Sequence, residues 1–235
     1  YIGEIFIREK GATITEKVAL IRRLRRRHYR LIVDLRTPVL PYILRADRRL
    51  IKLRGNIPGA HAVEEHYGVI SSVLPVAEAP PACCLYLDAR SKARADRLLR
   101  GLPGTQWLAV APGANWAGKK WPASQYQALL RSAASLFDSA VVVGSAEDET
   151  DARSFTNVGM PVLNLAGRTD LSLAAALLMR ASVFIGNDSG LGHIAAAVGR
   201  PTMTVFGPGR PERYRPWGSK TEDGRAPQAD RGRRT

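Results

Sequence analysis

Residues 183–208 read VFIGNDSGLGHIAAAVGRPTMTVFGP, and this stretch decides the fold. The apolar run VFIG ends in the polar turn NDSG, and the helical pattern LGHIAAAVG follows directly. A second apolar run, TMTVFG, completes the unit. Apolar runs of this length on either side of a helical pattern are typical of parallel strands joined by a helical crossover. The stretch therefore predicts a strand–helix–strand unit of an α/β domain.

The turn between the first strand and the helix is the first candidate site. Asp188 and Ser189 are residue types that cap helices, and Gly190 and Gly192 permit close approach to the backbone. The free amides of a first helical turn, together with the positive end of the helix dipole, attract anions. His193 could add a further donor. An ordinary capped helix explains the turn equally well, so both interpretations stay open on this segment alone.

A second loop carries positive charge to the same edge of the expected sheet. Residues 108–122 read LAVAPGANWAGKKWP, in which a strand ends in a Pro-Gly loop and a helix starts near Pro122. Ligands of open α/β sheets bind outside the carboxyl ends of the strands. Both loops leave such ends, so we expect Lys119 and the Asp188 turn to converge on one phosphate group. Lys120 is expected to point elsewhere.

A third expected strand, residues 140–144, ends in the acidic run SAEDE. Carboxylates in this run could accept hydrogen bonds from ribose hydroxyls. The same acids also suit a solvated helix start, because Asp and Glu favour a first helical turn. The sequence leaves the two interpretations open.

The segments PGANWAGKKWP, VVVGSAEDE and LAGRTDLSLAAALLMRASVFIGNDSGLGHIAAAVGRPTMTVFGP share one motif order. That order is PGA…K-x-W-P, G-x-x-x-E/D, L-x-G-x-T-x-L and N-D-S-G-x-x-H-x-A-A-A-x-G-x-P-T. It resembles the lipopolysaccharide heptosyltransferases, glycosyltransferase family nine, over about residues 108–208, and more weakly upstream in HYRLIVDLRT and HAVEEHYGVISSVL. The resemblance implies an α/β fold of the GT-B type, with two Rossmann-like domains of which the first is incomplete.

The resemblance also implies a reaction. An acceptor hydroxyl attacks the anomeric carbon of ADP-heptose with inversion, ADP leaves, and the acceptor is an anionic, Kdo-bearing inner-core lipid at the inner membrane surface. The implied donor-binding residues are Asn115, Lys119, Glu147, Glu149, Asp188, Ser189, Gly190 and His193. Glu147 and Glu149 are alternative ribose partners, and Arg8 and Lys10 are expected to bind the acceptor. No D-x-D metal motif occurs, so we expect metal-independent diphosphate binding and no cofactor.

The catalytic base of the family has no counterpart here. The family places it in a loop that would precede Tyr1, so no catalytic residue is assigned and the chain as given is expected to be inactive. Two alternatives stay open. The chain is a related enzyme that uses another nucleotide sugar, or it is a non-catalytic nucleotide-binding protein or adaptor that uses its basic helix.

Charge is the compositional outlier, with a formal net charge of +14. Residues 15–29, TEKVALIRRLRRRHY, predict an amphipathic basic helix, and the basic tail 219–235 is expected to be disordered. A basic face suits anionic lipid, while no nucleic-acid-binding motif is present. No apolar run reaches the roughly 20 residues of a membrane span. We therefore expect a cytoplasmic protein, peripheral on the inner membrane.

The expected organisation has three parts: an acceptor-side domain over 1–88, a nucleotide-sugar-binding domain over 89–218 and the tail. Strands are expected at Glu4–Ile7 and Leu31–Leu35, on either side of the basic helix, and Leu85–Leu87 is expected to be the last strand of the first domain. The uncertainty of the boundary near residue 88 is about five residues.

Overall fold

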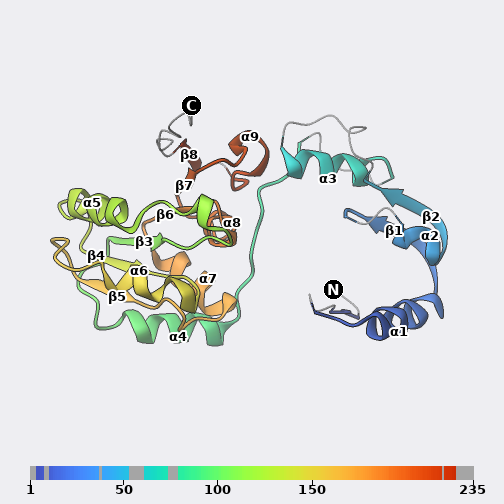
Figure 1. The fold of residues 1–235 in the computed structure, drawn as a ribbon, viewed down its shortest axis with the longest axis horizontal. Helices are drawn as coiled ribbons and strands as arrows, with labels where there is room; N and C mark the ends of the chain where they lie inside the picture. Colours follow the sequence, from blue (N-terminus) through green and yellow to red (C-terminus); the bar gives the residue numbers. More distant parts are fainter. Residues whose placement is uncertain are drawn as a thin grey trace, which may run out of the picture. The chain divides into compact units, whose positions relative to one another are not determined.

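The computed structural model describes residues 4–7, 11–36, 39–52, 61–73, 79–218 and 220–225. The chain divides into two compact units, Tyr1–Pro80 and Pro81–Thr235, and each is described by itself (Figure 1). Within the described ranges, no helix is both long enough and apolar enough to cross a bilayer.

The two units divide between Pro80 and Pro81, ahead of the boundary expected near residue 88. The reason is that residues 81–88 are hydrogen-bonded to the second unit. The indole N–H of Trp217 donates to the Pro81 carbonyl at 3.0 Å, and the Leu85 amide donates to the Ala197 carbonyl at 3.0 Å. The strand expected at Leu85–Leu87 is wrong, since this segment joins neither sheet and Tyr86 is 94% exposed.

The first unit is built around a short parallel sheet. Strands β1 and β2 pair with His28 opposite Arg45 and Asp34 opposite Ile51. The elements are α1 (Ile14–Arg25), β1 (His28–Asp34), α2 (Leu40–Ile43), β2 (Arg45–Ile51) and α3 (Ala62–Ser71). The basic helix expected over residues 15–29 thus ends earlier than predicted, because its last residues belong to β1.

Helix α1 begins with a capping box in which the Thr13 side chain accepts from the Glu16 amide and the Glu16 carboxylate accepts from the Thr13 amide. None of its residues is buried, and Ile14 on its apolar face is 80% exposed. The strand expected at Glu4–Ile7 is wrong, since the segment lies outside both described sheets. Its Glu4 carboxylate pairs with arginines of the α1 region, and Ile7 is 83% exposed.

The second unit contains a six-stranded parallel sheet in the order β5-β4-β3-β6-β7-β8. From β3 the chain adds β4 and β5 on one side, and then returns to add β6, β7 and β8 on the other. The strands are β3 (Trp107–Ala111), β4 (Ser139–Val142), β5 (Val162–Asn164), β6 (Val183–Asn187), β7 (Thr202–Phe206) and β8 (Thr221–Arg225). The predicted strand–helix–strand unit is confirmed as β6, α8 and β7.

Helices cover both faces of this sheet (Figure 1). One core cluster packs α4, α7 and α8 against alternate strand residues such as Ala109 and Phe184, and the other packs α5 and α6 against Leu108 and Val142. The helices are α4 (Ala89–Leu99), α5 (Ala123–Ala133), α6 (Glu149–Arg153), α7 (Leu171–Arg180), α8 (Gly190–Ala197) and α9 (Pro211–Tyr214), with 3-10 turns η1 (Ala117–Lys119) and η2 (Ala146–Asp148). Burial on both faces explains why the central strands are mostly apolar.

The disorder expected for the tail is wrong for residues 221–225. These residues form β8, which pairs in parallel with β7 so that Thr221 lies opposite Thr202. Their sequence, TEDGR, is polar because an edge strand leaves one side to solvent. The rest of the tail lies outside the described residues.

Candidate functional site

The order of strands in the second sheet reverses between β3 and β6, and open α/β sheets bind ligands at such a switch point. Strand β3 ends at Ala111 and strand β6 ends at Asn187. The loop after β3 carries Lys119, and the turn after β6 carries Asp188. The candidate site is therefore the carboxyl edge of the sheet at these two strands.

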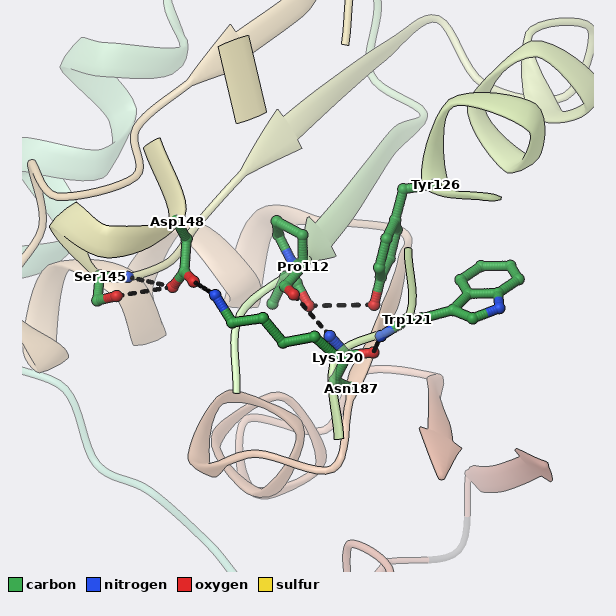
Figure 2. A network of polar contacts seen from close by, with 8 residues as sticks. Pro112, Lys120, Trp121, Tyr126, Ser145, Asp148 and Asn187 are labelled. Atoms are coloured by element: carbon green, nitrogen blue, oxygen red, sulfur yellow. Dashed lines mark hydrogen bonds and ion pairs between the residues drawn. The ribbon is translucent and has the colours of Figure 1, made fainter. Parts of the chain in front are cut away.

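The loop between β3 and α5, residues 112–122, is held at both of its ends by Asn187. The side chain is fully buried, its Nδ2 donates to the Pro112 carbonyl at 2.6 Å, and its Oδ1 accepts from the Trp121 amide at 3.0 Å (Figure 2). The hydroxyl of Tyr126 donates to the Ala111 carbonyl just before the loop. Sequence reasoning missed Asn187; the available signal was an amide side chain at the last position of an otherwise apolar strand.

The structure brings Lys119 and Asp188 together, as the strand ends predict. The Lys119 ammonium lies 2.5 Å from Asp188 Oδ2, and the Asp188 side chain is only 10% exposed. The Asp188 backbone is itself held, because its amide donates to the Val205 carbonyl of β7 at 3.1 Å. The cation is thus fixed beside the first turn of α8.

Among the described residues, no side chain caps the first turn of α8. Ser189, and not Asp188, occupies the N-cap position, and its side chain makes no capping hydrogen bond. The Ser189 Oγ is buried and without a partner among the described residues. A Cβ at Gly190 would have nothing within 4 Å. The amides of this turn therefore remain available to an anion, which an uncapped helix N-terminus attracts.

Two further residues of the α8 turn have different surroundings. Gly192 is buried, and a Cβ there would lie 3.2 Å from Thr204 Oγ1 and 3.3 Å from Pro216. The close approach expected at Gly192 is made by β7 and by Pro216, so its small size serves the packing of α8. His193 lies on the exposed side of α8.

The remaining expected site residues divide into three groups. Asn115 and Glu147 are exposed on the loops after β3 and β4. Glu149 pairs with Arg153, one helical turn later, at 2.9 Å. The acceptor residues expected from the sequence, at positions 8 and 10, lie outside the described residues.

Lys120 points away from Lys119, as expected, and ends on a carboxylate that sequence reasoning had not selected. Its ammonium donates to Asp148 Oδ1 at 2.8 Å (Figure 2). Asp148 is 5% exposed, and its Oδ2 accepts from the amide and the hydroxyl of Ser145 at 2.9 and 2.7 Å. The available signal was the S-x-x-D spacing of Ser145 and Asp148, which is a capping-box pattern.

The Lys120–Asp148 pair is charged throughout the neutral range. Burial raises the pKa of Asp148, but the hydrogen bonds from Lys120 and Ser145 outweigh it, so the pKa lies below its usual value. The hydrogen bond to Asp148 raises the pKa of Lys120 despite partial burial. A carboxyl with a depressed folded pKa stabilises the fold above its unfolded pKa, and that stability is lost as the pH falls through the folded pKa.

We expect Asp148→Asn to reduce the free energy of unfolding at pH 7 by about 1–3 kcal/mol, because a charged hydrogen bond is weakened. The difference from the wild type should shrink as the pH falls below about 4, where the wild-type carboxyl also becomes neutral. Urea unfolding followed by tryptophan fluorescence measures this, since Trp107, Trp116, Trp121 and Trp217 all lie in the second unit. A difference that stays constant down to pH 2 would contradict the expectation.

Metal ligands are not grouped in the part of the chain that the structure describes. Among those residues, no set of three or more His, Cys, Asp or Glu side chains is placed to hold a metal ion. Lys119 and the N-terminus of α8 both supply positive potential at the candidate site.

A parallel sheet in this order, with a lysine and an uncapped helix at its switch point, defines a Rossmann-type α/β domain. The chain belongs to glycosyltransferase family 9 (heptosyltransferase), whose model matches residues 17–231.

Curated relatives carry heptosyltransferase names. Lipooligosaccharide heptosyltransferase 2 of Haemophilus influenzae is 31% identical over 161 residues, which cover 63% of this chain and 46% of that protein. Lipopolysaccharide heptosyltransferase 2 of Escherichia coli is 34% identical over 111 residues, covering 45% of this chain and 32% of that protein. The matched region thus spans less than half of the length of each relative.

Solved structures share the fold. The glycosyl transferase family 9 protein of Veillonella parvula has a TM-score of 0.76 at 17% identity, covering 93% of this chain and 69% of that one. E. coli ADP-heptose lipopolysaccharide heptosyltransferase II has a TM-score of 0.72 at 21% identity, covering 92% and 74%. An E. coli heptosyltransferase with ADP has a TM-score of 0.67 at 20% identity, covering 91% and 71%. The expectation of an α/β fold of the GT-B type is confirmed.

Proposed function

We propose that the chain binds ADP-heptose through its second unit and takes part in heptose transfer to an inner-core lipopolysaccharide acceptor. Family membership supports the reaction class, and the relatives' names support heptose. The observation that carries the proposal is the meeting of Lys119 with the uncapped turn of α8 at the switch point. That arrangement suits a diphosphate, which needs several donors and a compensating cation.

In the proposed complex the diphosphate lies on the first turn of α8. The amides of that turn, among them that of Gly190, donate to phosphate oxygens, and the unpartnered hydroxyl of Ser189 adds a donor. Lys119 supplies the charge, and Asp188 keeps its ammonium beside the turn. His193 and Asn115, both exposed, are the further donors in this proposal.

The ribose is proposed to lie against the loop after β4. Glu149 is less suited to it, since its carboxylate accepts a hydrogen bond from Arg153. Glu147 is exposed on η2 and is the preferred ribose partner. A carboxylate can accept hydrogen bonds from both ribose hydroxyls.

The proposed chemistry is an inverting displacement. The acceptor hydroxyl oxygen bonds to the anomeric carbon, the bond from that carbon to the phosphate oxygen breaks, and ADP leaves with the electron pair. The hydroxyl proton passes to a base that we do not assign. Negative charge grows on the departing phosphate, where Lys119 and the α8 turn would stabilise it electrostatically without a metal.

The acceptor side of the proposal rests on charge. We assign acceptor binding to Arg8 and Lys10, and contact with anionic lipid to the basic face of α1 and the residues after it. The cations of that face are Arg22, Arg23, Arg25, Arg26 and Arg27. In this proposal the protein is cytoplasmic and peripheral on the inner membrane.

The proposal is tested by titrating the chain with ADP in a calorimeter, with and without EDTA. We expect binding in both cases, with dissociation constants that agree within about twofold, a free-energy difference of about 0.4 kcal/mol. The physical reason is that Lys119 and the helix amides supply the positive potential. Loss of ADP binding on chelation would show that a metal is required, and no binding in either buffer would remove the donor-site proposal itself.

A further inference from the structure

Two neighbouring lysines of the β3–α5 loop are held by carboxylates on opposite sides. Lys119 pairs with Asp188, which follows β6, whereas Lys120 pairs with Asp148, which follows β4. Since β4 and β6 flank β3 in the sheet, the two ion pairs connect the end of the loop to the segments that follow both neighbouring strands. The donor-site proposal uses Lys119 only and leaves the second pair without a role.

Asp148 is well placed to act as a rigid anchor. Its side chain is 7% exposed, and Ser145 holds the carboxylate through two hydrogen bonds in addition to that from Lys120. The beginning of the loop also packs directly on it: a Cβ at Gly113 would lie 2.1 Å from Asp148 Oδ2. A side chain at position 113 therefore has no space unless the carboxylate moves.

The loop is thus clamped at its base by two buried polar side chains. Asn187 binds the backbone of Pro112 and Trp121, and Asp148 binds Lys120 (Figure 2). Asp148 also packs against Gly113, next to Pro112. One clamp comes from the end of β6 and the other from the loop after β4. Lys119 directly precedes Lys120 and Trp121, the two residues at this end of the loop that Asp148 and Asn187 hold. The backbone position of Lys119 therefore depends on both side chains.

We propose that Asp148 and Lys120 are positioning residues, which hold the β3–α5 loop in the shape that presents Lys119 to the donor diphosphate. The inference rests on the proposed function, because the ligand concerned is the diphosphate of ADP. Lys120 is assigned no ligand contact, because its ammonium is held on Asp148 in the loop after β4, whereas Lys119 is held on Asp188 at the α8 turn. Lys120 affects the ligand only through Lys119, so its effect on ADP affinity should disappear when Lys119 is removed.

The test is a double-mutant cycle on ADP affinity, measured by calorimetry at pH 7.5. The proteins are the wild type, Lys120→Gln, Lys119→Ala and the double variant. We expect Lys120→Gln to weaken ADP binding by about 3- to 30-fold in the wild-type background, as for coupled neighbours, and by less than about twofold in the Lys119→Ala background. Adenosine, which has no phosphate, should bind all four proteins alike.

A conservative variant separates positioning from a general loss of structure. Lys120→Arg keeps a cation that can reach Asp148, so we expect its ADP affinity within about threefold of the wild type. Tryptophan fluorescence before each titration reports whether the second unit is folded, and Asp148→Asn replaces Lys120→Gln in the cycle if the latter is unfolded. An Arg variant as weak as the Gln variant would overturn the proposal.

The failures are distinguishable. If the wild type does not bind ADP, the proposed function fails. If ADP binds and Lys119→Ala weakens it, but Lys120→Gln has no effect, the positioning role fails alone. If Lys120→Gln weakens ADP equally in both backgrounds, Lys120 contacts the ligand directly and the inference is overturned.

Discussion

Lys119→Ala should weaken ADP binding by about 10- to 100-fold, which corresponds to the loss of one charged hydrogen bond of about 1.5–3 kcal/mol. Adenosine binding should be unchanged, because the ammonium is proposed to contact phosphate and not the nucleoside. The structure adds a second reason for a large effect. Without Lys119, the largely buried Asp188 carboxylate would be left unpaired beside the bound diphosphate. Calorimetric titration with ADP and with adenosine measures both constants.

The matched control for this substitution is Lys220→Ala. Lys220 is exposed and precedes the edge strand β8, so its removal changes the net charge equally without touching the switch point. Lys120→Ala is unsuitable as a control, since it would break the ion pair with Asp148. Equal losses of ADP and adenosine affinity in Lys119→Ala would mean that Lys119 acts through folding.

Asn187→Ala should lower the free energy of unfolding of the second unit by about 2–5 kcal/mol, because it leaves one buried and one half-buried backbone group without hydrogen bonds. These groups are the Pro112 carbonyl and the Trp121 amide, at the two ends of the loop. Urea unfolding followed by tryptophan fluorescence measures the change. The variant should also lose ADP affinity, because the loop that carries Lys119 loses one of its two clamps.

Asn164→Ala is the matched control for the same substitution. Asn164 is half-buried at the end of β5, and its side chain accepts one local hydrogen bond, from the Ala166 amide at 3.0 Å. We expect it to lower the free energy of unfolding by about 1 kcal/mol. If Asn187→Ala destabilises the unit no more than Asn164→Ala does, the loop is not held by Asn187.

Much of the second unit could be predicted from the sequence. Apolar runs bounded by Gly-rich turns predicted β3, β4, β6 and β7, because central strands of a parallel sheet are buried on both faces. The meeting of Lys119 with Asp188 was predictable for a geometric reason. The carboxyl ends of parallel strands share one edge of the sheet, so loops that follow neighbouring strands lie together.

The errors arose where local composition gives little information on pairing. The polar segment 221–225 forms a strand because β7 provides a partner, and the apolar segment Glu4–Ile7 joins neither described sheet. The close approach that Gly192 permits is made by Thr204, a residue of the next strand that the sequence could not identify. Each outcome depends on a neighbour that is distant in the chain.

By itself, the sequence determined the class of fold, the helix that follows β6 and the lysine-bearing loop that follows β3, since these depend on residue type and on spacing within one segment. Only the tertiary structure decided what holds that loop. The partners Asn187 and Asp148 lie 75 positions after Pro112 and 28 positions after Lys120, respectively. Hydrogen bonds depend on distance and direction in space, and strand order determines which loops become neighbours. Two buried polar side chains that looked ordinary in the sequence therefore became the clamps of the candidate site.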